Sequence, residues 1–111
     1  MGSNNDQAID SAVQQILGAV QPYKELHPAA EIEARRHDSA SIGVRIVDPD
    51  FSGIDRLERE DRVWPLLDKL PEDVQSELSM LVLVTPSEKF TSVASTTFQE
   101  IYMRTSNDAP K

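Results

Sequence analysis

The most constraining feature of this sequence lies between Ser41 and Glu88, where two apolar segments are separated by a stretch of helical periodicity. The first segment, residues 42–47, alternates like a strand, and Asp48-Pro49-Asp50 ends it because proline cannot donate a hydrogen bond to a sheet. The second, Leu78 to Val84, is apolar on both faces, as in a parallel strand covered on two sides. Two strands joined through helices indicate a crossover connection that covers one face of a sheet.

The segment between these strands has apolar residues at helical spacing but contains a proline. Inside one continuous helix, Pro65 would clash with the preceding turn. We therefore predict two short helices that meet near Glu60-Asp61, with Asp61 as the cap of the second and Pro65 in its first turn. Pro71-Glu72-Asp73 is predicted to end the second helix. The apolar helical positions are Leu57, Val63, Leu66, Leu67 and Leu70.

The N-terminal part of the sequence predicts a helix followed by a β-hairpin. One apolar stripe runs along the helix, which Asn5 or Asp6 would cap and Pro22 would end. Residues 30–36 alternate weakly, as in a half-exposed strand, and the short joint 37–41 connects them to the strand at 42–47. The two strands are therefore expected to pair antiparallel. The stripe consists of Ile9, Val13, Ile16, Leu17 and Val20.

The C-terminal part begins with a helix-start pattern. In Thr85-Pro86-Ser87-Glu88, threonine is the cap, proline the first helical residue and glutamate the third. A last amphipathic helix is expected to follow, and residues 105–111 are expected to form a disordered tail. The apolar positions of that helix are Phe90, Val93, Ala94, Phe98 and Ile101.

Together these elements predict one α/β (α+β) domain over residues 1–104, with a core from about residue 8 to 101 and the element order α-β-β-α-α-β-α. A chain of 111 residues is long enough for one core. The first three helices are expected on one face of a three-stranded mixed sheet. The other face of the third strand, which we place at Leu81 and Leu83, needs a cover from the C-terminal helix or from a partner protein.

Composition excludes several kinds of function. Without cysteine, this chain alone supplies no disulfide and no thiolate ligand. A net charge of −8 disfavours nucleic-acid binding, and Arg35, Arg36 and Arg45 form only a weak basic candidate patch. No apolar run is long enough to span a membrane and the first residues lack a signal-peptide pattern, so we expect a cytoplasmic protein. In the absence of a catalytic triad or a glycine-rich phosphate loop, we expect no enzymatic activity and no cofactor.

Two aspartates beside Pro49 offer oxygen ligands for a hard cation. We interpret Asp48 and Asp50 as turn residues, because aspartate hydrogen-bonds its own backbone in turns and calcium requires about six or more oxygens. His27 precedes Pro28, so its backbone is expected to be extended. We assign no metal to any of these three side chains.

A phenylalanine–glycine turn, an arginine and an aliphatic–aromatic pair follow one another from residue 51 onward: Phe51-Ser52-Gly53, Arg59 and Val63-Trp64. With Leu67 and Thr85-Pro86-Ser87-Glu88, they resemble the motifs of the BolA family over roughly residues 30–88. The resemblance implies a type II KH-like fold. It also implies a non-enzymatic regulatory module, associated with stress responses, that pairs with monothiol glutaredoxins.

The chain departs from the resemblance at the positions of the family's histidines. Glu60, Glu77 and Ser41 stand where the family has histidine, and the hairpin loop that carries a further ligand is shorter. A [2Fe–2S] iron accepts imidazole or thiolate far more readily than carboxylate. We therefore expect no histidine-ligated cluster, and His37 and Glu77 remain weak metal-ligand candidates. The absence of a G-x-x-G loop also counts against KH-type RNA recognition.

The residues and the resemblance lead to one main hypothesis and two alternatives. We expect a protein-interaction module, monomeric or weakly dimeric, that contacts its partner through Arg59, Trp64, Leu81 and Leu83. The first alternative is a nucleic-acid-binding transcriptional regulator on the same fold. The second is a glutaredoxin partner in iron handling.

Overall fold

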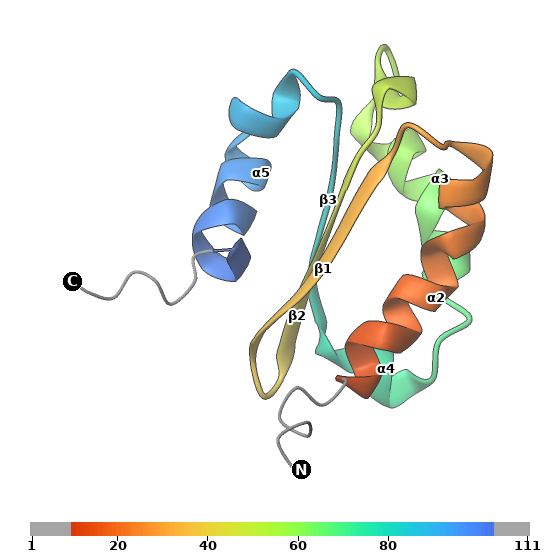
Figure 1. Cartoon of the computed structure of the whole chain (residues 1–111), viewed down its shortest axis with the longest axis vertical. Helices are drawn as coiled ribbons and strands as arrows, with labels where there is room; N and C mark the ends of the chain where they lie inside the picture. Colours follow the sequence, from red (N-terminus) through yellow and green to blue (C-terminus); the bar gives the residue numbers. More distant parts are fainter. Residues whose placement is uncertain (1–9, 104–111) are drawn as a thin grey trace, which may run out of the picture.

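The computed structural model describes residues 10–103 of the chain. Its helices and strands follow the predicted order α-β-β-α-α-β-α (Figure 1). They are α2 (Ser11–Leu26), β1 (Glu31–Asp38), β2 (Ser41–Val47), α3 (Arg56–Leu67), α4 (Glu72–Glu77), β3 (Leu78–Val84) and α5 (Val93–Phe98). The short turns are η1 (Pro49–Phe51), η2 (Glu88–Phe90) and the π-helical η3 (Gln99–Met103). None of the described helices is long and apolar enough to cross a membrane.

The three strands form one mixed sheet in the order β1-β2-β3. β1 and β2 pair antiparallel across a two-residue turn of Ser39 and Ala40, which confirms the predicted hairpin. Asp38 accepts a hydrogen bond from the Ala40 backbone N–H at 2.8 Å and so closes that turn. β2 and β3 pair parallel, as expected of strands joined by a crossover through α3 and α4.

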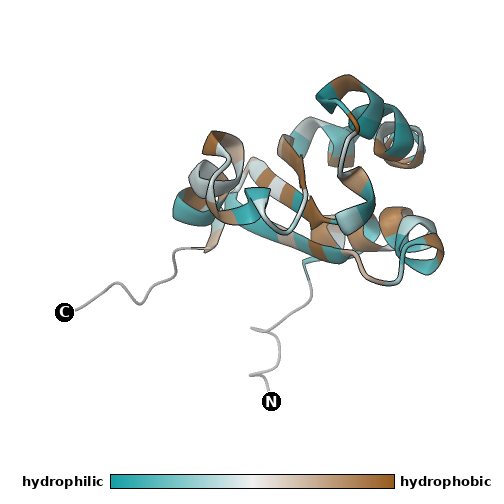
Figure 2. Cartoon of the chain, turned by 90° about the horizontal axis from the view of Figure 1, so that it is seen from above, coloured by the Kyte–Doolittle hydropathy of each residue, from teal (hydrophilic) through white to brown (hydrophobic). Residues whose placement is uncertain are grey.

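Helices cover both faces of this sheet (Figure 1 and Figure 2). On one face, α2, α3 and α4 enclose the larger core, and on the other face α5 encloses a smaller one. The fully buried members of the larger core are Ile16, Val20, Ala30, Ile42, Val44, Ile46, Phe51, Val63 and Leu67. The smaller core consists of Val47, Val82, Val84 and Phe98, with Met80, Tyr102 and Met103 packed against them.

The second face of β3 is covered through different residues from those predicted. Val82 and Val84 contact α5, whereas Leu81 and Leu83 pack against the larger core on the opposite face. Successive side chains of a strand point to opposite faces, so these two pairs cannot share a cover. Because every residue in this part of β3 is apolar, the sequence alone did not distinguish the two faces.

Two helix boundaries predicted from prolines were wrong. α2 continues through Pro22 to Leu26, and α3 is one helix with Pro65 inside it, so no new helix begins at Asp61. A proline removes the hydrogen bond to the carbonyl four residues earlier. Those carbonyls belong to Gly18 and Asp61, both exposed residues, so water can replace the missing donor.

The helix ends also differ from the prediction. Asp10 caps α2 by accepting a hydrogen bond from Val13 N–H at 3.2 Å; the predicted caps Asn5 and Asp6 lie outside the described residues. Asp55 caps α3 through Glu58 N–H at 2.9 Å. The second helix of the crossover is α4, which follows Pro71 instead of ending there.

The C-terminal helix-start pattern forms, but a long helix does not follow it. Thr85 N–H donates to Glu88 Oε1 at 2.9 Å and Glu88 N–H donates to Thr85 Oγ1 at 3.2 Å, the reciprocal bonds of a capping box. Only the single turn η2 comes next, and α5 begins separately after Ser92. Phe90 and Val93 are exposed, so the predicted apolar face is formed by Phe98 and by residues after it. The predicted tail at 105–111 lies outside the described residues.

Candidate functional site

The outer edge of β3 is the main candidate surface. β2 pairs with one side of β3, and within residues 10–103 no strand pairs with its other side. Two hollows flank this free edge. The first, about 430 Å³, lies between α3 and the chain after β3, and its lining includes Arg59, Leu81, Leu83, Glu88 and Val93. The second, about 370 Å³, is lined by Glu60, Asp61, Trp64 and residues 78–81.

Arg59 fastens three segments together at the first hollow. Its guanidinium donates to the carbonyl oxygens of Ile54 at 2.7 Å and Leu83 at 2.9 Å, and to the Glu88 carboxylate at 2.7 and 3.3 Å. It also lies 5.5 Å from the centre of the Phe51 ring. Because only 12% of the side chain is exposed, Arg59 fixes the shape of the hollow and presents little charge to a partner.

The same contacts act on Glu88. The Arg59 guanidinium, supported by the Thr85 N–H, lowers the pKa of the Glu88 carboxyl below its usual value. Glu88 therefore stays ionised and holds both the capping box and Arg59. The first hollow is thus bordered by an internally satisfied ion pair.

Trp64 is the most accessible aromatic side chain beside the second hollow. It is 41% exposed on α3 and lines the second hollow together with Leu81, which also lines the first. Glu60 and Asp61 lie one turn earlier on the same helix and give this hollow an acidic border. The structure therefore brings all four predicted partner-binding residues to one region: Arg59, Trp64, Leu81 and Leu83.

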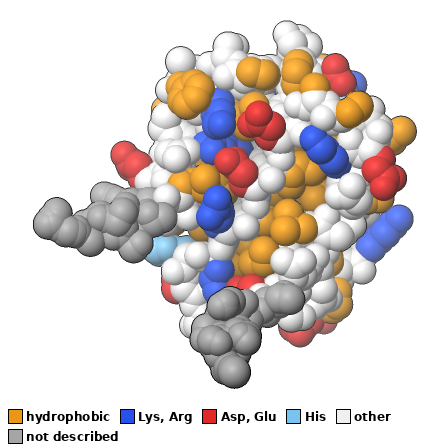
Figure 3. All heavy atoms as spheres, viewed as in Figure 1, with side chains coloured by type: hydrophobic (Ala, Val, Ile, Leu, Met, Phe, Trp, Pro, Cys, Tyr) orange, Lys and Arg blue, Asp and Glu red, His pale blue; other side chains and the backbone are white. Residues whose placement is uncertain are grey.

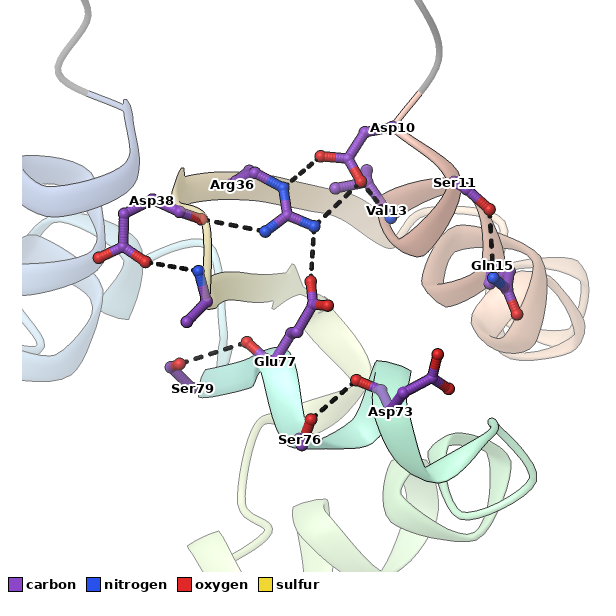
Figure 4. A network of polar contacts seen from close by, with 11 residues as sticks. Asp10, Ser11, Val13, Gln15, Arg36, Asp38, Asp73, Ser76, Glu77 and Ser79 are labelled. Carbon is purple, nitrogen blue, oxygen red and sulfur yellow. Dashed lines mark hydrogen bonds and ion pairs between the residues drawn. The ribbon is translucent and has the colours of Figure 1, made fainter.

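The three arginines of the predicted basic patch do not form one surface. Arg36 lies on the α2 side, donating to Asp10 and, at 2.6 Å, to Glu77 (Figure 4). Arg45 points to the other face, where it is 1% exposed. Of the three, only Arg35 is exposed. On the face seen in Figure 3, basic and acidic side chains are interspersed around a hydrophobic region.

Arg45 has structural partners on every side. It donates to Glu33 across the hairpin at 2.7 and 3.0 Å and to Ser95 Oγ at 3.1 Å, and its guanidinium lies 4.8 Å from the centre of the Phe98 ring. A side chain buried in this way cannot contact a nucleic-acid backbone. Arg45 instead attaches α5 to the sheet.

The two weak metal-ligand candidates lie apart in the structure. Glu77 accepts from Arg36, and His37 meets the Tyr102 ring edge-on with centroids 5.6 Å apart. In the described part of the chain, the histidine that does lie among carboxylates is His27, whose ring faces Asp48 and Asp50. In the sequence, each of these three side chains has an ordinary role beside a proline. Hairpin pairing is the signal that connects them, because the residues before β1 and after β2 must lie side by side.

A neighbouring hydrogen bond orders this group of side chains. Tyr23 donates its hydroxyl to Asp48, and the Tyr23 ring stacks on the His27 ring with centroids 4.2 Å apart. Burial and the bond to Asp48 raise the pKa of Tyr23, so its hydroxyl remains a donor.

Comparison with known proteins gives a likeness of fold. No protein-family model matches the sequence, and no curated protein matches it. Two solved structures are similar. The first is BolA1 from Arabidopsis thaliana: the matched region covers 72% of this chain and 98% of the BolA1 chain, with 23% sequence identity and a TM-score of 0.49. The BolA domain of SufE1 from the same plant covers 73% and 99%, with the same identity and TM-score.

Proposed function

We propose that this protein is a non-enzymatic interaction module that binds an extended segment of a partner protein along the free edge of β3. The observation that carries the proposal is the unpaired edge itself, flanked by two hollows and an exposed tryptophan. A peptide that adds to a sheet edge gains main-chain hydrogen bonds, and neighbouring pockets then select its side chains.

The hydrogen bonds already made by β3 indicate which backbone groups are available. The carbonyl of Val84 accepts from Asp48 N–H on the β2 side, whereas the carbonyl of Leu83 accepts from Arg59 on the outer side. Backbone groups of residues two apart in a regular strand point the same way, so those of Leu81 face outward with those of Leu83. The pairing with β2 shifts between Ile42 and Gly43, so this alternation does not extend to Ser79. Arg59 therefore occupies the Leu83 end of the edge and leaves the backbone groups of Leu81 for a partner.

Side-chain chemistry defines the kind of segment that fits. Trp64 and the half-buried Leu81 form an apolar contact area, and tryptophan is prominent among residues that dominate binding energy. Glu60 and Asp61 beside them favour a basic neighbour. The expected ligand is an extended segment with one large apolar side chain and at least one lysine or arginine.

Trp64 is the only tryptophan of the chain, so its fluorescence reports on this surface. Following the family resemblance, we would titrate the protein with a tryptophan-free variant of a monothiol glutaredoxin and record ¹⁵N spectra in parallel. Binding is expected to shift the amides of Ser79 and Leu81. Trp64→Ala should weaken affinity by about thirtyfold, the usual scale for a dominant interface residue. Leu57→Ala is the matched control, because Leu57 is 72% exposed on the same helix but lines neither hollow.

The outcomes separate the three functions. Shifts confined to residues away from β3 and α3 would contradict the edge-binding proposal. Shifts on adding duplex DNA at low salt, abolished by Arg35→Ala, would favour the nucleic-acid alternative. A new visible absorption band on adding iron and glutaredoxin, lost in His37→Gln or Glu77→Gln, would favour the iron-handling alternative.

A further inference from the structure

A second, independent site lies at the far end of the hairpin, where His27 meets Asp48 and Asp50. The hairpin pairs Glu31 with Val47, so the residues just before β1 come beside those just after β2. His27 is the residue that caps the end of α2, and the two aspartates flank Pro49 in the turn η1. Two segments, held side by side by the hairpin, thus bring one imidazole and two carboxylates together.

The three side chains converge on a common point. His27 Nδ1 lies 2.8 Å from Asp50 Oδ2 and 3.5 Å from Asp48 Oδ2, and one ligand atom from each residue falls within 4.8 Å of the other two. Ligands at tetrahedral positions around zinc, each about 2.0–2.1 Å from the metal, are themselves about 3.4 Å apart. The 2.8 Å between His27 Nδ1 and Asp50 Oδ2 is shorter than this ligand separation, and the Asp50 side chain, which is 62% exposed, is free to move outward to reach it.

One imidazole in this group contacts two carboxylates, of which one is fully buried. The Asp48 side chain has no exposed surface, and a buried carboxylate requires a cationic or strongly hydrogen-bonding partner. Among residues 10–103, no lysine or arginine forms an ion pair with Asp48 or Asp50. The imidazole of His27 contacts both carboxylates, and the buried Asp48 also accepts from the Tyr23 hydroxyl and the Asp50 N–H.

We propose that His27 Nδ1, Asp48 Oδ2 and Asp50 Oδ2 bind a zinc ion, with water as the fourth ligand. One imidazole nitrogen with two carboxylate oxygens suits zinc, whereas calcium and magnesium prefer oxygen alone. This site is separate from the β3 edge and does not depend on the proposed function.

The surroundings already resemble those that orient metal ligands. The Tyr23 hydroxyl donates to Asp48 Oδ2, and the Asp50 backbone N–H donates to Asp48 Oδ1 at 2.9 Å. The Tyr23 ring stacks on His27 at an interplanar angle of 16° and so fixes the direction of the imidazole. Partners that hold ligands in place commonly change metal affinity by about 10–100-fold when removed.

The test is zinc binding by the full chain, measured by competition with a chromophoric chelator. Replacing a direct ligand in His27→Gln or Asp50→Asn should weaken zinc by at least about tenfold, and Tyr23→Phe by about 10–100-fold. The matched control is His37→Gln, which removes the only other histidine and should leave affinity unchanged. Calcium should not compete.

Circular dichroism of each variant in the absence of zinc shows whether it is folded, and Asp50→Asn, at an exposed side chain, is expected to fold normally. The proposal is overturned if the full chain does not compete with the chelator for zinc. It is equally overturned if folded His27→Gln and Asp50→Asn bind zinc as tightly as the unmodified chain does, which would place binding on other carboxylates.

Discussion

Replacing Arg59 with alanine should destabilise the fold far more than replacing any exposed arginine of α3. The side chain is 12% exposed and donates to two backbone carbonyls and to the Glu88 carboxylate. Each bond between a charged donor and a neutral acceptor contributes about 1.5–3 kcal/mol, and the sum is not additive. Glu88 is 40% exposed and can be hydrated again, so the lost ion pair adds little.

We therefore expect Arg59→Ala to lower the free energy of unfolding by about 3 kcal/mol, mainly because the carbonyl oxygens of Ile54 and Leu83 lose their hydrogen-bond donor. With a urea m value of about 1–3 kcal/mol/M, the midpoint of unfolding should fall by about 1–3 M at an unchanged m value. The stability of Arg59→Lys should lie between that of the unmodified chain and that of Arg59→Ala, because lysine keeps the charge but cannot reproduce the fork of donors.

Arg56 supplies the matched control for this experiment. It lies on the same helix, is 87% exposed, and has Glu60 at 3.5 Å as its partner in an i,i+4 pair. Arg56→Ala should change stability by less than about 0.5 kcal/mol. If Arg59→Ala proves no more destabilising than Arg56→Ala, the view of Arg59 as the fastening between η1, β3 and the capping box is wrong.

Two further predictions concern the C-terminal segment. A Cβ on Gly43 would lie 2.7 Å from the Tyr102 ring, so Gly43→Ala should lower the free energy of unfolding, measured by thermal denaturation, by about 1–3 kcal/mol. Gly18 on α2 has open space around it, so Gly18→Ala should raise that free energy by about 0.4–1 kcal/mol. Equal effects of the two substitutions would contradict close packing of Tyr102. The pKa of Glu88 is lowered on folding by Arg59, so its stabilising contribution is present above the ordinary value of 4.5 and is lost as the pH falls through the folded value. Glu88→Gln should therefore flatten the dependence of urea stability on pH between about pH 5 and pH 3, and an unaltered slope would contradict the ion pair.

Alternation and turn chemistry were enough to predict the strands and the hairpin, because each depends on residues close in the sequence. The crossover followed from the general rule for two strands joined through helices. The positions of Pro22 and Pro65 were misinterpreted because the cost of a proline depends on whether water reaches the carbonyl that it leaves unpaired. That accessibility is decided by which side of the helix packs on the sheet. It is therefore a property of the tertiary structure, as is the choice between Leu81 and Val82 for the α5 face.

The candidate site was predictable to a different extent. Trp64 and Leu81 were named from the resemblance and from apolar character, and the structure places them beside one free strand edge. Arg45 was assigned to the surface because it is charged. Its burial follows from a partner on another strand, since Glu33 lies directly across the hairpin from it. A charge pattern read along the chain cannot show that pairing.

The ion pair between Glu33 and Arg45 depends on the register of the hairpin. The pairing shifts between Arg36 and Asp38, so that β1 contains one extra residue, His37, near the turn. If the pairing of Asp38 with Ser41 continued without that shift, Glu33 would lie opposite Ile46. Each face of the sheet would then carry a mixture of charged and apolar side chains. The bulge instead sets Glu33 opposite Arg45 and Glu31 opposite Val47. One irregular residue thereby determines the ion pair through which Arg45 holds α5 on the sheet.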